Sequence, residues 1–217
     1  MGQKVLITAA ASGIGLEIAR AFSAAGATVF ITDISAQAIE AAKKEIPGLL
    51  STLCDNSKRS DIEAMVPAAV KALGGLDVLV NNAGIAGPTA PVEEVDPDKW
   101  EQVLQVDVIG TFNVTRLAIP HLKKSSAGSI IIMSSLGGRF GYPNRSAYNV
   151  AKAGLIGFAK TLAIELGDHN IRTNAIAPGA VGGQRIENVL AVAQGRRVRQ
   201  WRTRERPCSA SRRSSGL

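Results

Sequence analysis

The stretch Thr8-Ala9-Ala10-Ala11-Ser12-Gly13-Ile14-Gly15 decides the fold, because it joins an apolar run over residues 4–8 to a helical pattern that begins at Gly15. Small residues let a backbone approach a pyrophosphate closely, and the start of a helix offers free N–H groups and the positive end of its dipole. Any α/β domain can also use such a stretch as a tight strand-to-helix connection, so the surrounding residues must decide between the two.

An acidic residue at the end of the next β-rich run favours a dinucleotide site. Asp33 follows Gly15 by about 18 residues, a spacing typical of dinucleotide-binding units. Its carboxylate can accept both ribose hydroxyls of NAD and would repel the extra phosphate of NADP. Ile34 comes next, and Ser12 offers no basic side chain for that phosphate. We therefore expect NAD to be preferred over NADP.

Short β-rich runs alternate with longer amphipathic stretches along the chain. This alternation predicts βαβ units, and therefore a parallel sheet with helices on both faces. The expected fold is α/β, a Rossmann-like doubly wound sheet of six strands in one domain over residues 1–184. Strands are expected over residues 4–8, 28–32, 49–53, 77–80, 129–134 and 171–176, and helices over 15–25, 35–45, 60–73, 97–122 and 147–166.

Two more loops follow predicted strands. Asp55 and Asn56 come after the third strand, and Asn81-Asn82-Ala83-Gly84 comes after the fourth. Ligands of open α/β sheets bind outside the carboxyl ends of the strands, so both loops are candidates for the dinucleotide site. Asn also adopts turn conformations readily, which is the alternative explanation for the second loop.

Tyr148 and Lys152 lie four residues apart at the start of a predicted helix, so their side chains share one face. A free tyrosine has a pKa of about 10, too high for a base at neutral pH. An ammonium beside it and a cationic nicotinamide stabilise the phenolate and lower that pKa, so that tyrosine can exchange a proton with an alcohol. Ser135, after Ser134 at the end of the preceding strand, can hold the substrate oxygen. By itself this Tyr–Lys spacing is more often a surface pair.

The cysteines and histidines argue against a disulfide framework and a metal site. Cys54 and Cys208 lie far apart and form neither a disulfide framework nor a ligand cluster, and His121 and His169 lack the spacing of a metal site. No metal is expected.

The net charge of +7 comes entirely from residues 185–217, which hold nine arginines and two glutamates. The residues before them balance, so no basic face for nucleic acid is indicated. The N-terminus has neither a signal-peptide layout nor a myristoylation pattern, and no apolar run is long enough to span a membrane. We expect a cytoplasmic protein without a nucleic-acid or membrane partner.

Together these motifs resemble the short-chain dehydrogenase/reductase family over residues 3–184. The resemblance implies a nicotinamide-dependent oxidoreductase that interconverts a secondary alcohol and a ketone by hydride transfer. It implies that Tyr148 is the acid/base, Ser135 the substrate anchor and Lys152 the cation that lowers the tyrosine pKa. The motifs that match are Thr8, Gly13-Ile14-Gly15, Asp33, Asp55, Asn81-Asn82-Ala83-Gly84, Ser135, Tyr148, Lys152, Asn174 and Pro178-Gly179.

The resemblance also implies which residues bind NAD. Pro178 and Gly179 would line the nicotinamide, and the Val181 backbone would bind its carboxamide. The full expected set is Ala9, Ser12, Gly13, Ile14, Gly15, Asp33, Ile34, Asp55, Asn56, Asn82, Ala83, Gly84, Tyr148, Lys152, Pro178, Gly179 and Val181.

Two single residues depart from the family pattern. Ala9 stands where the family usually has its first glycine, and a methyl group is tolerable there if φ is negative. Asp107 stands where the family commonly has an asparagine that kinks the helix and holds a water beside the lysine. We count Asp107 with the catalytic residues, and we expect its charge to pair with Lys152 and to alter how the proton relay titrates.

The segment after Pro178-Gly179 is the third departure. The family continues there with a substrate-covering helical segment, a further helix and a seventh strand, whereas residues 185–217 are rich in arginine. We expect this tail to be disordered and to reflect a frameshift or truncation near residues 190–195. Strand 171–176 would then be an exposed sheet edge.

Several functions stay open on this basis. The first is an active oxidoreductase, and the second is a catalytically impaired module that holds NAD without a closed substrate site. A nucleic-acid binder using the arginine tail is disfavoured, because no aromatic array accompanies the arginines. An enzyme resembling 3-oxoacyl-acyl-carrier-protein reductase is a further alternative if the full-length frame is restored. Sugar alcohols, hydroxy acids, steroids and acyl-carrier-protein thioesters all suit the core. We expect a homodimer through helices 97–122 and 147–166, but no tetramer.

Overall fold

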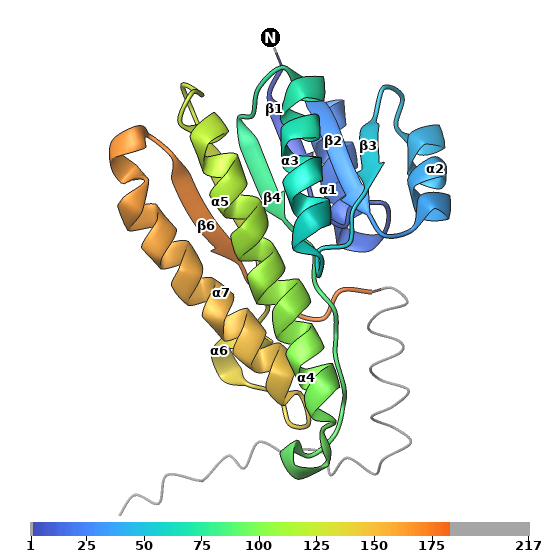
Figure 1. Cartoon of the computed structure of the whole chain (residues 1–217), viewed down its shortest axis with the longest axis vertical. Helices are drawn as coiled ribbons and strands as arrows, with labels where there is room; N and C mark the ends of the chain where they lie inside the picture. The colour runs from blue at the N-terminus through green and yellow to red at the C-terminus, as the bar shows by residue number, and fades with distance from the viewer. Residues whose placement is uncertain (1, 183–217) are drawn as a thin grey trace, which may run out of the picture.

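The computed structural model describes residues 2–182, and the predicted α/β fold is confirmed over this range (Figure 1). Six parallel strands form one sheet in the order β3-β2-β1-β4-β5-β6. Each predicted strand is present within one residue at either end. The strands are β1 (Lys4–Ile7), β2 (Thr28–Asp33), β3 (Leu50–Leu53), β4 (Val78–Asn81), β5 (Ser129–Met133) and β6 (Arg172–Ile176).

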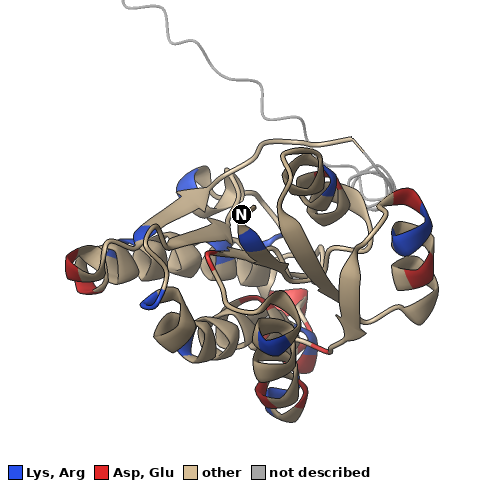
Figure 2. Ribbon diagram, turned by 90° about the horizontal axis from the view of Figure 1, so that it is seen from above, with Lys and Arg blue, Asp and Glu red and all other residues tan. Residues whose placement is uncertain are grey.

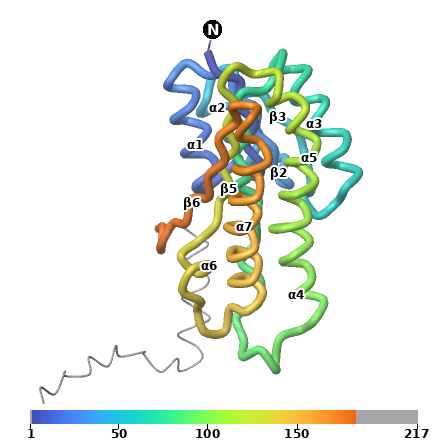
Figure 3. Tube along the Cα trace, turned by 90° about the vertical axis from the view of Figure 1, so that its left-hand side faces the viewer, coloured from blue at the N-terminus to red at the C-terminus, as the bar shows by residue number. Residues whose placement is uncertain are grey.

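Helices cover both faces of the sheet (Figure 3). Because side chains alternate along a strand, neighbouring strand residues enter two separate cores. Val5 and Ile7 belong to the core beneath α1 (Gly13–Ala24) and α2 (Ala36–Glu45), whereas Leu6 belongs to the core on the opposite face. The helices that cover this second face are α3 (Arg59–Leu73), α5 (Thr111–Leu122) and α7 (Ser146–Glu165).

The helix expected over residues 97–122 is interrupted. It consists of α4 (Pro97–Leu104), a π-helical segment η2 (Gln105–Gly110) and then α5. Close packing accompanies the interruption, since a Cβ on Gly110 would lie 2.4 Å from the carbonyl oxygen of Asn56. The wider turn of η2 contains Asp107, so the irregularity falls at a residue that the sequence analysis counted with the catalytic residues.

Three short elements were not predicted from the sequence: η1 (Val92–Glu94), α6 (Gly137–Phe140) and η3 (Gly167–His169). Each spans only three or four residues, too few to establish a helical period. Among them, α6 matters for function because it lies directly between β5 and α7 in the chain.

The strand order reverses between β1 and β4, which creates a crevice at the carboxyl ends of the strands. On the α1 side of the sheet, Asn174 and Ile176 of β6 are exposed in the described part of the chain. The arginine tail over residues 185–217 lies outside the described residues. Within residues 2–182, charges of both signs are interspersed over helices and loops (Figure 2), and none of the described helices is long and apolar enough to cross a membrane.

Candidate active site

The turn after β1 adopts a left-handed backbone at two positions. Gly13 has φ of +55°, and Ala9 has φ of +49°. A methyl group at Ala9 would be free of strain only at a negative φ, so this expectation is not met. The left-handed conformation costs an L-residue about 1–2 kcal/mol, because its Cβ crowds the following carbonyl oxygen. The turn keeps the shape that glycine would favour, and Ala9 bears the strain.

Hydrogen bonds from the loop after β4 hold this turn in place. The Asn82 side-chain amide donates to the carbonyl oxygens of Thr8 (3.1 Å) and Ala9 (2.7 Å). In return, the Thr8 hydroxyl accepts from the backbone N–H groups of Asn82 and Ala83, both at 3.0 Å. A Cβ on Gly15 would lie 2.7 Å from the Ala9 oxygen, so only glycine fits where α1 passes these two loops.

The start of α1 suits an anion. Its first-turn N–H groups have no acceptor within the helix, and they lie at the positive end of the helix dipole. The first turn of α1 contains no acidic residue, and Ser12, Gly13 and Ile14 are exposed. A Cβ on Gly13 would meet nothing within 4 Å, so this side of the turn is open space. These residues fit the pyrophosphate of a dinucleotide.

Asp33 lies at the end of β2 with its carboxylate fixed by two backbone groups. One oxygen accepts from the N–H of Ala11 and the other from the N–H of Ser35, each at 3.1 Å. A carboxylate has about four lone-pair sites, so both oxygens can accept a further hydrogen bond. Ile34 beside it is 74 % exposed. Asp33 is thus oriented at the crevice and still able to bind two hydroxyl groups.

The loop after β3 is held by its own hydrogen bonds. One Asp55 carboxylate oxygen accepts from the Ser57 hydroxyl (2.7 Å) and backbone N–H (2.9 Å). These bonds favour the ionised form and lower the pKa of Asp55 below its usual range. Asn56 is buried under Gly110. The loop therefore presents a fixed negative charge at the carboxyl edge of the sheet.

The two serines after β5 have different surroundings. The Ser134 hydroxyl donates to the backbone carbonyl of Lys152 at 2.7 Å and ties the strand to α7. The Ser135 hydroxyl accepts from the N–H of Gly137 at 3.1 Å, which leaves its own proton available. Ser134 is therefore structural, and Ser135 is the serine that can bind a ligand.

Lys152 forms a buried ion pair. Its ammonium lies 3.2 Å from a carboxylate oxygen of Asp107 in η2 and donates to the carbonyl of Met133 at 3.1 Å. The two side chains are 4 % and 0 % exposed. The other Asp107 oxygen accepts from the N–H of Ile85 at 2.7 Å. The expected pairing of Asp107 with Lys152 is thus present.

The loop after β4 also packs against this ion pair. A Cβ on Gly84 would lie 2.9 Å from the Asp107 carboxylate and 3.0 Å from the Lys152 ammonium. Asn81, at the start of the same loop, is buried and donates to the Thr115 hydroxyl at 2.9 Å. The four residues Asn81-Asn82-Ala83-Gly84 therefore join the glycine turn to the charged pair, with Asn81 serving the scaffold.

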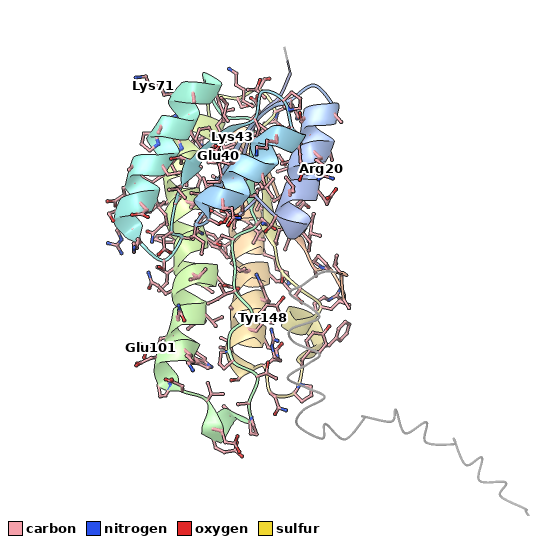
Figure 4. All side chains as sticks on the ribbon, turned by 90° about the vertical axis from the view of Figure 1, so that its right-hand side faces the viewer. Arg20, Glu40, Lys43, Lys71, Glu101 and Tyr148 are labelled. Carbon is pink, nitrogen blue, oxygen red and sulfur yellow. The ribbon has the colours of Figure 1, made fainter. Side chains whose placement is uncertain are left out.

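Two cations face Tyr148, which Figure 4 shows near the start of α7. The Lys152 ammonium lies 5.6 Å from the centroid of the tyrosine ring, and the guanidinium carbon of Arg145 lies 4.7 Å from it. Arg145 also donates to the carbonyl of Ala86 at 2.9 Å and is only 8 % exposed. Arg145 was not predicted from the sequence. It lies just before α7 with a non-helical backbone, so the sequence held no helical spacing that could have identified it.

The chain after β6 returns to the site. The Pro178 carbonyl accepts from the N–H of Leu136 at 3.0 Å, next to Ser135. Gly179 approaches the Leu136 side chain, and Val181 is 46 % exposed. Pro178 and Gly179, which are expected to line a nicotinamide, thus lie beside the residue that follows the expected substrate anchor.

The sequence analysis did not assign Cys54, His121 or His169 to the site, and these residues form no metal centre within the described range. Cys54 is buried, and burial raises the pKa of its thiol to about 12, so it is an inert thiol at neutral pH. Within residues 2–182, no three His, Cys, Asp or Glu side chains gather as metal ligands.

Known proteins are similar to this chain in sequence and in structure. The family model described as short chain dehydrogenase matches residues 3–191. The chain is 41% identical over 184 residues to a 3-oxoacyl-acyl-carrier-protein reductase of Thermotoga maritima, covering 83% of this chain and 74% of that protein.

Two solved structures are also similar. NAD⁺-bound xylitol dehydrogenase superposes with a TM-score of 0.85 at 30% identity, covering 89% of this chain and 76% of that one. A single-residue variant of actinorhodin polyketide ketoreductase with NADPH gives a TM-score of 0.86 at 32% identity, covering 91% of this chain and 78% of that one. The chain therefore belongs to the short-chain dehydrogenase/reductase family and is an oxidoreductase of that type.

Proposed function

We propose that this protein interconverts a secondary alcohol and a ketone with NAD, using Tyr148 as the acid/base. The observation that carries the proposal is the position of the Tyr148 ring, whose centroid lies 4.7 Å from the Arg145 guanidinium carbon and 5.6 Å from the Lys152 ammonium. A phenol at this position can exchange a proton with the oxygen of a bound alcohol or ketone.

Each residue then has a defined role. The Ser135 hydroxyl holds the substrate oxygen, and Tyr148 takes its proton in oxidation or returns it in reduction. Lys152 would hold the nicotinamide ribose and stabilise the phenolate, while Asp107 keeps the ammonium in place. Bound NAD supplies the carbon that accepts the hydride. Pro178, Gly179 and Val181 would line the nicotinamide.

NAD rather than NADP is the proposed cofactor because of Asp33. Similar structures contain either NAD⁺ or NADPH, so the choice depends on this chain's own residues. A fixed carboxylate beside the ribose repels a 2′-phosphate, and Ile34 offers no positive charge to hold one. Titration by nicotinamide fluorescence should show tighter NADH than NADPH binding. Asp33→Ala should reduce the difference by roughly tenfold, about 1.4 kcal/mol. Tighter NADPH binding in the parent would refute the preference.

The substrate class is tested with a panel. Similar proteins include reductases of acyl-carrier-protein thioesters and polyketides and a xylitol dehydrogenase. We therefore propose a screen of sugar alcohols, hydroxy acids, steroids and β-ketoacyl thioesters, followed through the absorbance of the reduced nicotinamide. Turnover of any secondary alcohol or ketone supports the activity. No turnover, despite NAD binding, supports the impaired NAD-binding module instead.

That second candidate has one specific observation in its favour. The α1-side face of β6 stays exposed at Asn174 and Ile176 within residues 2–182, next to the strand end where the substrate should enter. We propose that residues 1–184 form the NAD-binding and catalytic domain.

We also propose a homodimer through residues 97–122 and 147–166. Ile109, Phe112, Val150 and Ile164 are large apolar side chains exposed on these helices. Two such faces can cover each other in a self-complementary interface. Sedimentation velocity should give a dimer, and a monomer at high protein concentration would refute the interface.

A further inference from the structure

The short helix η1 and the first turns of α4 enclose a groove of about 260 Å³. Its lining is apolar apart from one carboxylate and consists of Val92, Val95, Pro97, Trp100 and Glu101. Val92 is 70 % exposed, and Trp100 is only partly buried. Apolar surface exposed to water costs about 25 cal/mol per Å², so an apolar side chain that covers this η1–α4 groove would be stabilised there.

The rim of the η1–α4 groove is acidic. Residues 92–101 contain five carboxylates and one lysine, a net charge of −4. Two of the carboxylates serve the helix, because Asp96 caps α4 and Asp98 lies in its first turn, where the helix dipole favours negative charge. Glu93 and Glu101 have no such role. Both are exposed and form no ion pair with the described residues, and Glu101 projects outward from α4 (Figure 4).

Carboxylates on other helices have cations close by. On α1 and α2, Glu17 and Glu45 pair with Arg20, and Glu40 pairs with Lys43. Residues 160–172, around the end of α7, hold two carboxylates together with one lysine and one arginine. Uncompensated negative charge and exposed apolar surface therefore coincide at the η1–α4 groove.

The chain also contains a segment of opposite charge. Residues 196–206 hold six arginines and one glutamate, a net charge of +5, with Trp201 at their centre. They lie outside the described residues and are separated from Gly182 by thirteen residues. A chain of that length spans up to roughly 45 Å, more than the width of about 40 Å expected for a domain of this size. The segment is therefore long enough to reach the η1–α4 groove.

We propose that residues 196–206 dock on the η1–α4 groove of the same chain. Trp201 enters the apolar hollow against Trp100, and the arginines beside it bind the two rim glutamates. Aromatic pairs attract each other beyond the area that they bury, and an arginine can bond a carboxylate through two parallel N–H groups. Because both partners belong to one chain, the local concentration of the segment is on the order of millimolar, so weak contacts suffice. The proposal is independent of the proposed dehydrogenase chemistry.

The composition of the chain permits a direct test. Trp100 and Trp201 are its two tryptophans, so Trp100→Phe keeps an aromatic lining and leaves Trp201 as the sole indole. Acrylamide is uncharged, so its quenching of indole fluorescence reports exposure and not the charge of the arginines. In the full chain at low salt, the quenching constant of Trp201 should be about half that of a synthetic peptide of residues 196–206. In 1 M NaCl, where the Debye length is about 3 Å, the two constants should agree.

Two double variants of the Trp100→Phe chain remove the same net charge and locate the contact. Glu93→Gln/Glu101→Gln keeps the shape of the rim and should remove more than about half of the protection of Trp201. Glu165→Gln/Asp168→Asn is the matched control, because it removes two exposed carboxylates near the end of α7. Both variants lower the long-range attraction equally, so the larger effect of the first reports the groove.

If Trp100→Phe does not fold, as judged by circular dichroism, the indole N–H resonance of Trp201 in the parent background replaces the fluorescence, with Trp201→Phe assigning it. Protection that is independent of protein concentration and lost mainly in the rim variant supports the inference. Quenching of Trp201 equal to that of the peptide at low salt would overturn it. Equal effects of the two double variants would also overturn it, since they indicate attraction without a defined groove. Protection that increases with protein concentration would overturn it in favour of docking on a second copy.

Discussion

The two halves of the sheet hold their functional groups by different means. On the β1–β4 side, the glycine turn and Asp33 are fixed by neutral partners: backbone N–H groups, carbonyls and the side chains of Thr8 and Asn82. On the β5–β6 side, Lys152 and Tyr148 are fixed by buried charges. The cofactor half therefore depends on backbone shape, whereas the catalytic half depends on electrostatic balance, and substitutions should separate the two.

The largest expected effect is on the charged side. Lys152→Met takes the ammonium away from the buried Asp107 carboxylate, which should lower the free energy of unfolding by about 3–5 kcal/mol. The loss should shrink at low pH, because a protonated Asp107 carries no charge. Urea unfolding measures both. Lys152→Met/Asp107→Asn is the matched control and should recover most of the stability. Equal losses in the single and double variants would show that the pair is not an electrostatic unit.

A smaller loss of stability is expected from a substitution that changes the backbone shape of the glycine turn on the cofactor side. In Gly15→Ala, the added Cβ would lie 2.6 Å from the Asn82 amide and 2.7 Å from the Ala9 oxygen. The turn must shift, so the free energy of unfolding should fall by about 1–3 kcal/mol and NADH affinity should fall with it. Gly167→Ala is the control, because a Cβ there meets nothing within 4 Å. An unchanged NADH affinity in Gly15→Ala would contradict the assigned cradle.

The smallest expected effect is a gain in the free energy of unfolding. Ala9 has φ of +49°, so Ala9→Gly relieves left-handed strain of about 1–2 kcal/mol and loses about 0.5–1 kcal/mol to the freedom of glycine in the unfolded chain. A net gain of about 0.5–1 kcal/mol should appear in thermal unfolding. Ala41→Gly, in the middle of α2, should instead lose about 1 kcal/mol. Destabilisation by Ala9→Gly would mean that the turn is not strained.

The sequence predicted these two halves to different degrees. Strands β1, β2, β4 and β5 follow from apolar runs between turn residues, because a buried parallel strand must be apolar on both faces. The edge strands β3 and β6 are more polar and follow instead from the alternation of β-rich runs with helical stretches. The π-helical segment at Asp107 was not predicted, since it repeats neither a helical nor a strand period. The φ of Ala9 was not predicted either, because the partners that fix it, such as Asn82, are distant in sequence.

The sequence likewise predicted only part of the candidate site. Tyr148, Lys152 and Ser135 were recognised from their order along the chain, and the pairing of Lys152 with Asp107 was expected. Arg145 was missed, because a residue three positions before a tyrosine gains meaning only when burial and the Ala86 carbonyl are seen. Local spacing therefore predicts which groups share an element, whereas burial and contacts between elements decide which charges act.

The most direct test of the proposed chemistry measures NAD binding and turnover in the same variant, Tyr148→Phe. The phenyl ring keeps its packing under Arg145, but the group that exchanges the proton is gone. We expect NADH affinity within about twofold of the parent's, well under 1 kcal/mol. Turnover of the best panel substrate should fall by roughly a hundredfold or more, as for the loss of a general acid/base. Turnover close to the parent's with NADH binding intact would contradict the central claim that Tyr148 carries the proton.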